Sequence, residues 1–447
     1  MYKRQGQAYS DSSAVLVLSS CLDETAAIQG QLHQMLDQRG AAATVCDWSH
    51  EARTADAAYA LIDRALDEFS GARKRSKHIQ VPIAQLEGVA DPARKPKSKR
   101  PTPPQVLAAD VSAVADLIAA ADNPIFVLGG GCLGVYPALI ADVVEQSGAL
   151  VFLTYAADGL LPPDHPQNLG CFLARPTSVE LFNQADLVVA VGSELAEVDL
   201  WRNNLGHTCL LVRVDIDPMV LADRHRADTR ILGSAESLFA GLTALNISKS
   251  SGWAGTDTAE RKATWTRESA AERPGIAEVC AVLENALPKD TMIFSDMTQF
   301  AYVGKEVWSM SHPGHWHHPT GFGTLGYALP AAIGGAMGRR GKPTLAIAGD
   351  YGFQYTVQEL GAAVEMKLSL PIIVWDNAKL KEIEDSMQRA QIAPNSVIAH
   401  NPDFCALARA YGANAVAPQN ADELVTAVTE AFNADGPTVI YLTLGVV

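Results

Sequence analysis

Short runs of β-branched and other apolar residues alternate with helix-like stretches along the whole sequence. Apolar runs of this length, without polar residues at every second position, are typical of strands that are buried on both faces. Because parallel strands need a crossover connection, usually a helix, the alternation predicts parallel sheets covered by helices. The expected fold class is therefore α/β, with three-layer parallel-sheet domains. The runs are AVLVLSS, NPIFVLGGG, ALVFLTY, DLVVAVGS, CLLVRVDID, TMIFSD, PTLAIAGD, PIIVWDN and TVIYLTL.

Two polar stretches rich in Pro, Lys, Ser or Gly interrupt this alternation, near residues 90–105 and 246–262. They predict linkers at 91–105 and 246–270. The chain would then consist of residues 1–90, a central domain at 106–245 and a third domain at 271–447. The first block contains one clear strand and closes at KHIQVPI, so we expect it to be the C-terminal remnant of a domain.

The balance of charges excludes some classes of partner. The formal net charge is -15 and the isoelectric point is about 5.2, so phosphate backbones and anionic lipids would be repelled. No apolar run approaches the roughly 20 residues that span a bilayer, and the first residues contain no signal-peptide core. We therefore expect neither nucleic acid nor membrane as a partner, a cytoplasmic location, and seven reduced cysteines.

Polar residues follow two of the predicted strands. Gly349-Asp350-Tyr351-Gly352 comes after PTLAIA, and Asp376-Asn377 comes after PIIVW. Because parallel strands end at the same edge of a sheet, Asp350 and Asn377 can meet there. A carboxylate and an amide oxygen suit Mg²⁺, which keeps further positions for phosphate and water, and a helix starting soon after Gly352 would direct N–H groups at phosphate. A plain turn after a strand is the competing interpretation of the tetrapeptide alone.

The wider context resembles the diphosphate-binding signature of thiamine-diphosphate enzymes. Gln358-Glu359-Leu360, a Leu-Pro entry into the next strand, and Asn377 all follow Asp350 in the order found in that family. The resemblance implies thiamine diphosphate and Mg²⁺ as cofactors. It implies that Asp350, Asn377 and the Lys379 carbonyl bind the metal, and that Gly349, Tyr351 and Gly352 lie beside the diphosphate.

A second segment, PTGFGTLGYALPAAIGGA from Pro319, is similar to the segment beneath the cofactor in the acetolactate synthase and 2-oxo acid decarboxylase superfamily. The resemblance implies that Leu325 wedges between the two cofactor rings and that Gly323, Thr324 and Leu325 contact the aminopyrimidine. GLLPPDHP, ADLVVAVGSELAE and VDIDP resemble the family's central domain, and GQAYSDSSAVLVLSS and KHIQVPI resemble the last portion of its pyrimidine-binding domain. The resemblance implies that residues 1–90 are the C-terminal remnant of the pyrimidine-binding domain and that 271–447 form the diphosphate- and metal-binding domain. The flavin-side pattern of the acetolactate synthases is not seen, so FAD is not expected.

The sequence departs from the family pattern in three ways. Tyr351 replaces the middle glycine of the usual Gly-Asp-Gly. The substitution removes backbone freedom, which matters unless φ at this position is one that residues with side chains commonly adopt. Asp376 replaces the first residue of the usual Asn-Asn pair. The family's activating Glu, early in the pyrimidine-binding domain, has no counterpart in this sequence, so we expect a fragment of a longer protein, with a separate subunit as the alternative.

The function implied by the resemblance is decarboxylation of a 2-oxo acid, with acetolactate synthase-like carboligation or a non-catalytic assembly subunit as alternatives. GDYGFQYTVQELG resembles decarboxylases of 5-guanidino-2-oxopentanoate, whose guanidinium a carboxylate can bind in bidentate fashion. Glu382, Glu384 and Asp385 are candidate substrate ligands, although a solvated helix face is equally compatible. His315, His317 and Gln299 are candidate catalytic residues. The resemblance also implies a homodimer or homotetramer that buries Leu325 and Asp350.

Overall fold

The computed structural model of the chain describes residues 2–23, 30–92, 99–247 and 252–446. The chain divides into two compact units, of which the first contains residues 1–105, 216–218 and 320–324 and the second contains the rest. Among the described residues, no helix is both long and apolar enough to cross a membrane.

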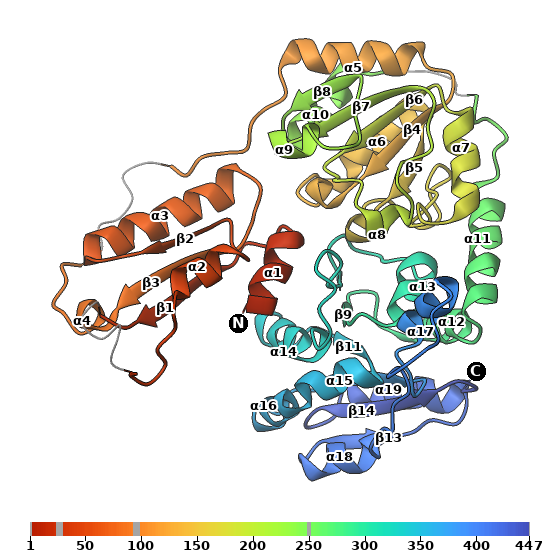
Figure 1. Cartoon of the computed structure of the whole chain (residues 1–447). Coiled ribbons are helices and arrows are strands. Elements are labelled where there is room, and N and C mark those ends of the chain that lie inside the picture. Colours follow the sequence, from red (N-terminus) through yellow and green to blue (C-terminus); the bar gives the residue numbers. More distant parts are fainter. Residues whose placement is uncertain (1, 24–29, 93–98, 248–251, 447) are drawn as a thin grey trace. The chain divides into compact units, whose positions relative to one another are not determined.

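The first unit is built on a three-stranded parallel sheet in the order β1-β3-β2 (Figure 1). The segment at 320–324 belongs to this unit because Gly321 N–H donates to Asp11 Oδ1 at 2.7 Å and Thr324 N–H donates to Gln7 Oε1 at 3.1 Å. Its elements are α1 (Tyr2–Ser10), β1 (Leu16–Cys21), α2 (Gln38–Ala43), β2 (Trp48–Glu51), α3 (Ala55–Gly71), β3 (Lys77–Pro82) and α4 (Ile83–Leu86).

The second unit contains two parallel sheets. The central one has five strands in the order β5-β4-β6-β7-β8. Along β4, Phe126 packs into one hydrophobic cluster while Ile125 and Val127 pack into another, so both faces are buried, as expected of a strand without polar alternation. Its elements are α5 (Ala108–Ala120), β4 (Pro124–Leu128), α6 (Pro137–Ser147), β5 (Leu150–Leu153), α7 (Val179–Gln184), β6 (Leu187–Val191), α8 (Glu197–Leu200), β7 (Leu210–Asp215), α9 (Pro218–Leu221), β8 (Thr229–Leu232) and α10 (Ala235–Leu245).

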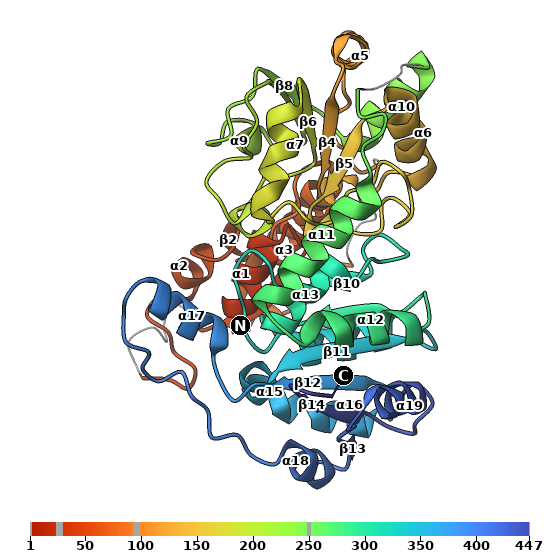
Figure 2. The same cartoon turned by 90° about the vertical axis from the view of Figure 1, so that its right-hand side faces the viewer.

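The C-terminal sheet has six parallel strands in the order β10-β9-β11-β12-β14-β13. Residues of α12, α13 and α19 pack on one face (Figure 2). Residues of α14, α15, α16 and α18 pack on the other. The helices are α11 (Thr258–Glu272), α12 (Ile276–Ala286), α13 (Gln299–Val307), α14 (Ala328–Gly338), α15 (Asp350–Thr356), α16 (Leu360–Glu365), α17 (Lys381–Arg389), α18 (Phe404–Ala410) and α19 (Ala421–Ala431). The strands are β9 (Met292–Ser295), β10 (Trp316–His317), β11 (Thr344–Gly349), β12 (Pro371–Asp376), β13 (Asn414–Val416) and β14 (Thr438–Thr443).

These sheets confirm the predicted fold class, and every apolar run named from the sequence contains a strand. One predicted linker differs from the structure. Residues 93–98 and 248–251 lie outside the described residues, but α11 occupies Thr258–Glu272, where a linker was expected up to residue 270. Its N-cap Asp257 accepts a hydrogen bond from Glu260 N–H, and Trp265 is buried against the central sheet. The helix therefore forms despite its polar composition, and the division into three domains stays a prediction.

Candidate cofactor and metal site

Two neighbouring strands bring the predicted site together. β11 and β12 are parallel, and Gly349 lies opposite Trp375 in the register of the pair. Asp350 follows Gly349, and Asp376 follows Trp375, so both acidic side chains lie at the carboxyl edge of the sheet, where α/β enzymes bind ligands. Both residues are buried, with 3% and 8% of their surface exposed.

Asn401 joins these two carboxylates. Its Nδ2 donates to Asp350 Oδ2 at 2.7 Å and to Asp376 Oδ1 at 2.8 Å, while Tyr441 Oη–H donates to Asp376 Oδ2 at 2.9 Å. Asn401 was not predicted from the sequence, because it lies in an irregular stretch before α18, far from either strand. Since the amide holds Asp350 Oδ2, it fixes how the carboxylate presents its other oxygen.

The electrostatics of this pair suit a cation. The pKa of Asp350 is raised to about 6, mainly by burial and also by the neighbouring Asp376 carboxylate, against hydrogen bonds from Asn401 and the Tyr351 backbone that lower it. A buried carboxylate beside a second one is stabilised by a bound positive charge. The donor set of carboxylate and amide oxygens therefore fits a hard divalent ion.

Asn377 and Lys379 form the turn that leaves β12. Asn377 Oδ1 accepts a hydrogen bond from Lys379 N–H at 3.2 Å, and Ala378 between them has a left-handed φ of 55°. The Asn377 amide oxygen thus faces its own turn, and its second lone pair stays available for a metal. Lys379 Nζ donates to both carboxylate oxygens of Glu384, at 3.1 and 3.2 Å.

The helix after β11 begins earlier than expected. α15 starts at Asp350 rather than after Gly352, and a short 3-10 turn at Val357–Glu359 separates it from α16. Tyr351 is a helical residue outside the left-handed region, so its substitution for glycine causes no backbone strain. Gly352 is required by sterics, because a Cβ there would lie 2.4 Å from Asp296 Oδ2.

Asp296 is a second residue that the sequence analysis missed, although it ends the TMIFSD run. It is fully buried after β9, and its Oδ2 accepts a hydrogen bond from Gly326 N–H at 2.8 Å. Asp296 thereby connects the carboxyl edge of the sheet with the residue after Leu325. Leu325 itself is half-buried, whereas Gly323 and Thr324 belong to the first unit. Contact of these three residues with a cofactor stays a prediction.

The candidate substrate residues meet at one end of α13. Gln299 Nε2 donates to Glu382 Oε2 at 3.1 Å and to Asp385 Oδ2 at 3.3 Å, and Arg273 also donates to Glu382 Oε2 at 3.1 Å. α17 is thus held against the first residue of α13 through its carboxylates. Glu384 points elsewhere, because Lys379 and Lys381 pair with it.

The histidines divide between the two edges of the sheet. His315 precedes β10 and lies beside Asp290, which precedes β9, so it occupies the amino edge, opposite to Asp350. His317 stacks on Phe294 with ring centroids 4.8 Å apart, and burial lowers its pKa to about 4. His318 follows β10, where its Nδ1 lies 2.9 Å from Ser295 Oγ and burial lowers its pKa to about 3. Both imidazoles are therefore neutral at pH 7.

Parallel sheets with buried oxygen ligands after two adjacent strands are typical of α/β enzymes that bind a diphosphate cofactor through a divalent ion. The comparisons with known proteins agree. The model of the thiamine pyrophosphate enzyme C-terminal TPP-binding domain matches residues 296–442, and that of the thiamine pyrophosphate enzyme central domain matches residues 111–244. The chain belongs to the thiamine pyrophosphate enzyme family.

Similar proteins include decarboxylases and carboligases. The chain is 38% identical to a probable 2-ketoarginine decarboxylase of Pseudomonas aeruginosa, over 98% of this chain and 79% of the relative. It is 25% identical to the acetolactate synthase isozyme 2 large subunit of Escherichia coli, over 75% of this chain and 62% of the relative. The crystal structure of benzoylformate decarboxylase from Polynucleobacter necessarius has the same fold, with a TM-score of 0.82 and 19% identity over 99% of this chain and 84% of that one. Together with the family, the relatives support thiamine-diphosphate-dependent 2-oxo acid decarboxylation.

Proposed function

We propose that this chain decarboxylates a 2-oxo acid whose side chain ends in a guanidinium group, such as 5-guanidino-2-oxopentanoate. The observation that carries the proposal is the Glu382 carboxylate, which already binds the guanidinium of Arg273 at 3.1 Å at the end of α13. Gln299 and Asp385 lie beside it. The relative at 38% identity is described as a 2-ketoarginine decarboxylase, and 2-ketoarginine is this compound.

The positions of these groups suggest how each would act. Among the described residues, Glu382 Oε1 has only a long 3.5 Å contact, with Arg389. A substrate guanidinium would bind this oxygen or displace Arg273 from the other one. Gln299 would hold α17 in place, because its amide donates hydrogen bonds to Glu382 and Asp385. Neutral His318 would offer a hydrogen bond, because an imidazole with a pKa near 3 carries no charge for a substrate carboxylate.

The same proposal covers the metal and the cofactor. Asp350, the Asn377 amide and the Lys379 carbonyl would hold Mg²⁺, with Gly349, Tyr351 and Gly352 beside the diphosphate. Support comes from the buried, oxygen-rich edge formed by Asp350 and Asp376. Bound thiamine diphosphate would supply the electron sink for loss of carbon dioxide, and the protein would contribute position and electrostatics. We also propose that the active form is a homodimer or homotetramer.

Release of carbon dioxide from paired substrates tests the proposal. 5-Guanidino-2-oxopentanoate should be decarboxylated with a much higher kcat/KM than 2-oxopentanoate, which lacks the guanidinium. Glu382→Gln should lower kcat/KM for the guanidino substrate by about 10- to 100-fold, since a charged hydrogen bond contributes about 1.5–3 kcal/mol. It should change the value for 2-oxopentanoate little, and Glu430→Gln, on the exposed face of α19, serves as the control.

Two results would contradict the proposal. An equal loss for both substrates in Glu382→Gln would mean that this carboxylate does not recognise the guanidinium. Formation of acetolactate from pyruvate at a higher kcat/KM than either decarboxylation would favour the carboligase alternative, which the acetolactate synthase relatives support.

A further inference from the structure

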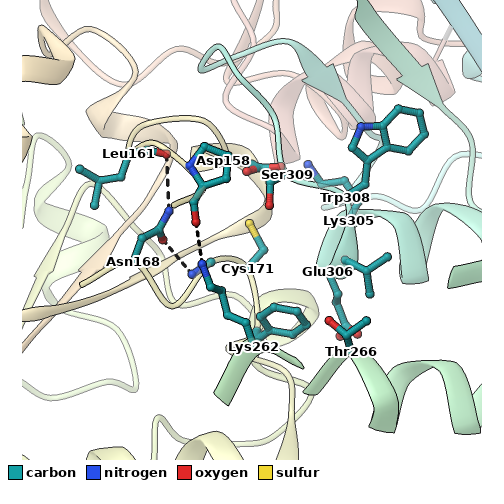
Figure 3. Close-up of a pocket in the computed structure, with 14 residues that line it drawn as sticks. Asp158, Leu161, Asn168, Cys171, Lys262, Thr266, Lys305, Glu306, Trp308 and Ser309 are labelled. Atoms are coloured by element: carbon teal, nitrogen blue, oxygen red, sulfur yellow. Dashed lines mark hydrogen bonds between the residues drawn. The ribbon is translucent and has the colours of Figure 1, made fainter. Parts of the chain in front are cut away.

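A cavity of about 190 Å³ lies between the irregular stretch that follows β5, helix α11 and the C-terminal end of α13, away from the candidate cofactor site. α13 begins at Gln299, whereas the cavity is lined by residues around Lys305–Ser309 at its other end, roughly 13 Å along a nine-residue helix. Figure 3 shows Asp158, Cys171 and Lys262 grouped on one side of the cavity and Trp308 on the other.

Asp158 is the unusual residue of this cavity. It is 92% buried, and its Oδ1 accepts a hydrogen bond from Met310 N–H at 3.4 Å. Its Oδ2 has no hydrogen-bond partner in the described part of the chain. A buried carboxylate oxygen without a hydrogen bond is destabilising, because the nearby Lys305 charge and the Gly159 N–H compensate the carboxylate only in part for its lost hydration. Buried polar groups in proteins are usually paired, so a donor or a cation placed in the cavity would stabilise Asp158.

Two ammonium groups line the same cavity. Lys305 is buried, and its Nζ donates to the Tyr155 carbonyl at 2.5 Å. Lys262 Nζ, on α11, donates to the Pro163 carbonyl at 2.6 Å. Each ammonium has three protons and uses one in these bonds, so each retains donors for an anionic group. The Glu306 carboxylate is already satisfied by Arg175 and Ser269.

The walls and the volume limit the size of a ligand. Trp308, Phe172 and Leu161 make part of the lining apolar, which suits a short carbon chain. An engineered cavity of about 150 Å³ binds benzene, so this one has room for about six to eight non-hydrogen atoms. A lone metal ion would be repelled by the two ammonium groups, and a simple anion would lie against the Asp158 carboxylate.

We propose that this cavity binds a small zwitterion, an amino acid of about six to eight non-hydrogen atoms, with its ammonium on Asp158 Oδ2 and its carboxylate toward Lys262 and Lys305. The ligand would satisfy the unpaired carboxylate oxygen and would bridge the irregular stretch after β5 to the C-terminal end of α13. This site is independent of the function proposed above, because none of its residues belongs to the cofactor edge.

Calorimetric titration of the whole chain at pH 7.5 tests the proposal. The probes are L-alanine, β-alanine and 4-aminobutyrate, each compared with propionate and propylamine, which carry only one of the two charges. We expect at least one amino acid to bind with a Kd of 1 mM or lower, and both single-charge compounds to bind at least tenfold more weakly. Asp158→Asn and Lys262→Met should each weaken amino acid binding at least tenfold.

The control is Lys367→Met, which removes an exposed lysine far from the cavity and should leave the Kd unchanged. Thermal melting without ligand shows whether each variant is folded, and Lys262→Met decides the question if Asp158→Asn fails to fold. The proposal is overturned if none of the amino acids binds, if both cavity variants bind as wild type does, or if propionate binds as tightly as the amino acids.

Discussion

Replacing Asn401 by alanine removes the amide that joins the two buried carboxylates of the candidate metal site. Two hydrogen bonds to charged acceptors, at 2.7 and 2.8 Å, are lost, and Asp350 and Asp376 are left facing each other. Hydrogen bonds to charged groups contribute about 1.5–3 kcal/mol each, and contributions from one network are not additive. We therefore expect the free energy of unfolding to fall by about 2–4 kcal/mol in the absence of metal.

Mg²⁺ with thiamine diphosphate should reverse much of this loss. A divalent ion bound at Asp350 neutralises the repulsion that the amide had relieved, so the deficit with saturating Mg²⁺ and cofactor should be less than half of that in EDTA. Affinity for Mg²⁺ should still fall about 10- to 100-fold, because groups that orient metal ligands contribute on that scale.

Urea unfolding at pH 7.5, followed by tryptophan fluorescence in EDTA and in Mg²⁺ with cofactor, measures both quantities. Asn395→Ala is the matched control, because Asn395 is an exposed residue of the same irregular stretch and its loss should change stability by less than about 0.5 kcal/mol. A deficit of equal size in the two buffers would refute the reasoning, since the amide would then stabilise the fold without acting on a metal site.

Three further predictions concern other residues. Asp350→Ala should abolish Mg²⁺-dependent binding of thiamine diphosphate in calorimetric titration, and unchanged affinity would exclude Asp350 as a metal ligand. Burial raises the pKa of Asp158 to about 6, above the unfolded value of about 3.8, so wild type should lose up to about 3 kcal/mol of stability as the pH rises from 4 to 7. Asp158→Asn should lack this loss, and parallel pH profiles from urea unfolding would contradict the assignment. Gly352→Ala should destabilise the protein by at least about 1–3 kcal/mol, because its Cβ would lie 2.4 Å from Asp296, whereas Gly334→Ala, with open space around its Cβ, should be neutral or stabilising.

The strands and the edge at which Asp350 lies could be predicted from the sequence because they depend on local patterns. An apolar run such as PTLAIAGD buries both faces of a strand wherever it lies, and the residue after the run must emerge at the carboxyl edge. The helix α11 was not predicted, because its composition is polar and its apolar contact with the central sheet is made by a single buried residue, Trp265.

The placement of the histidines depended on strand order. HPGHWHH places His315 and His318 only three residues apart. The short strand β10 (Trp316–His317) lies between them, so His315 is at the amino edge of the sheet and His318 is at the carboxyl edge. A sequence pattern that names several histidines cannot tell which of them reach the carboxyl edge. The pairing of β10 with β9 decides that.

The sequence by itself determined the α/β class, the two strand ends that carry Asp350 and Asn377, and the family resemblance. These features could be predicted because the burial of a strand and the position of its end depend on contiguous residues. Only the tertiary structure decided that Asn401 bridges the two carboxylates, that Arg273 contacts Glu382, and that Asp158 Oδ2 has no hydrogen-bond partner among the described residues. These contacts join residues far apart in the chain, and their geometry follows from how helices and loops pack around the sheets.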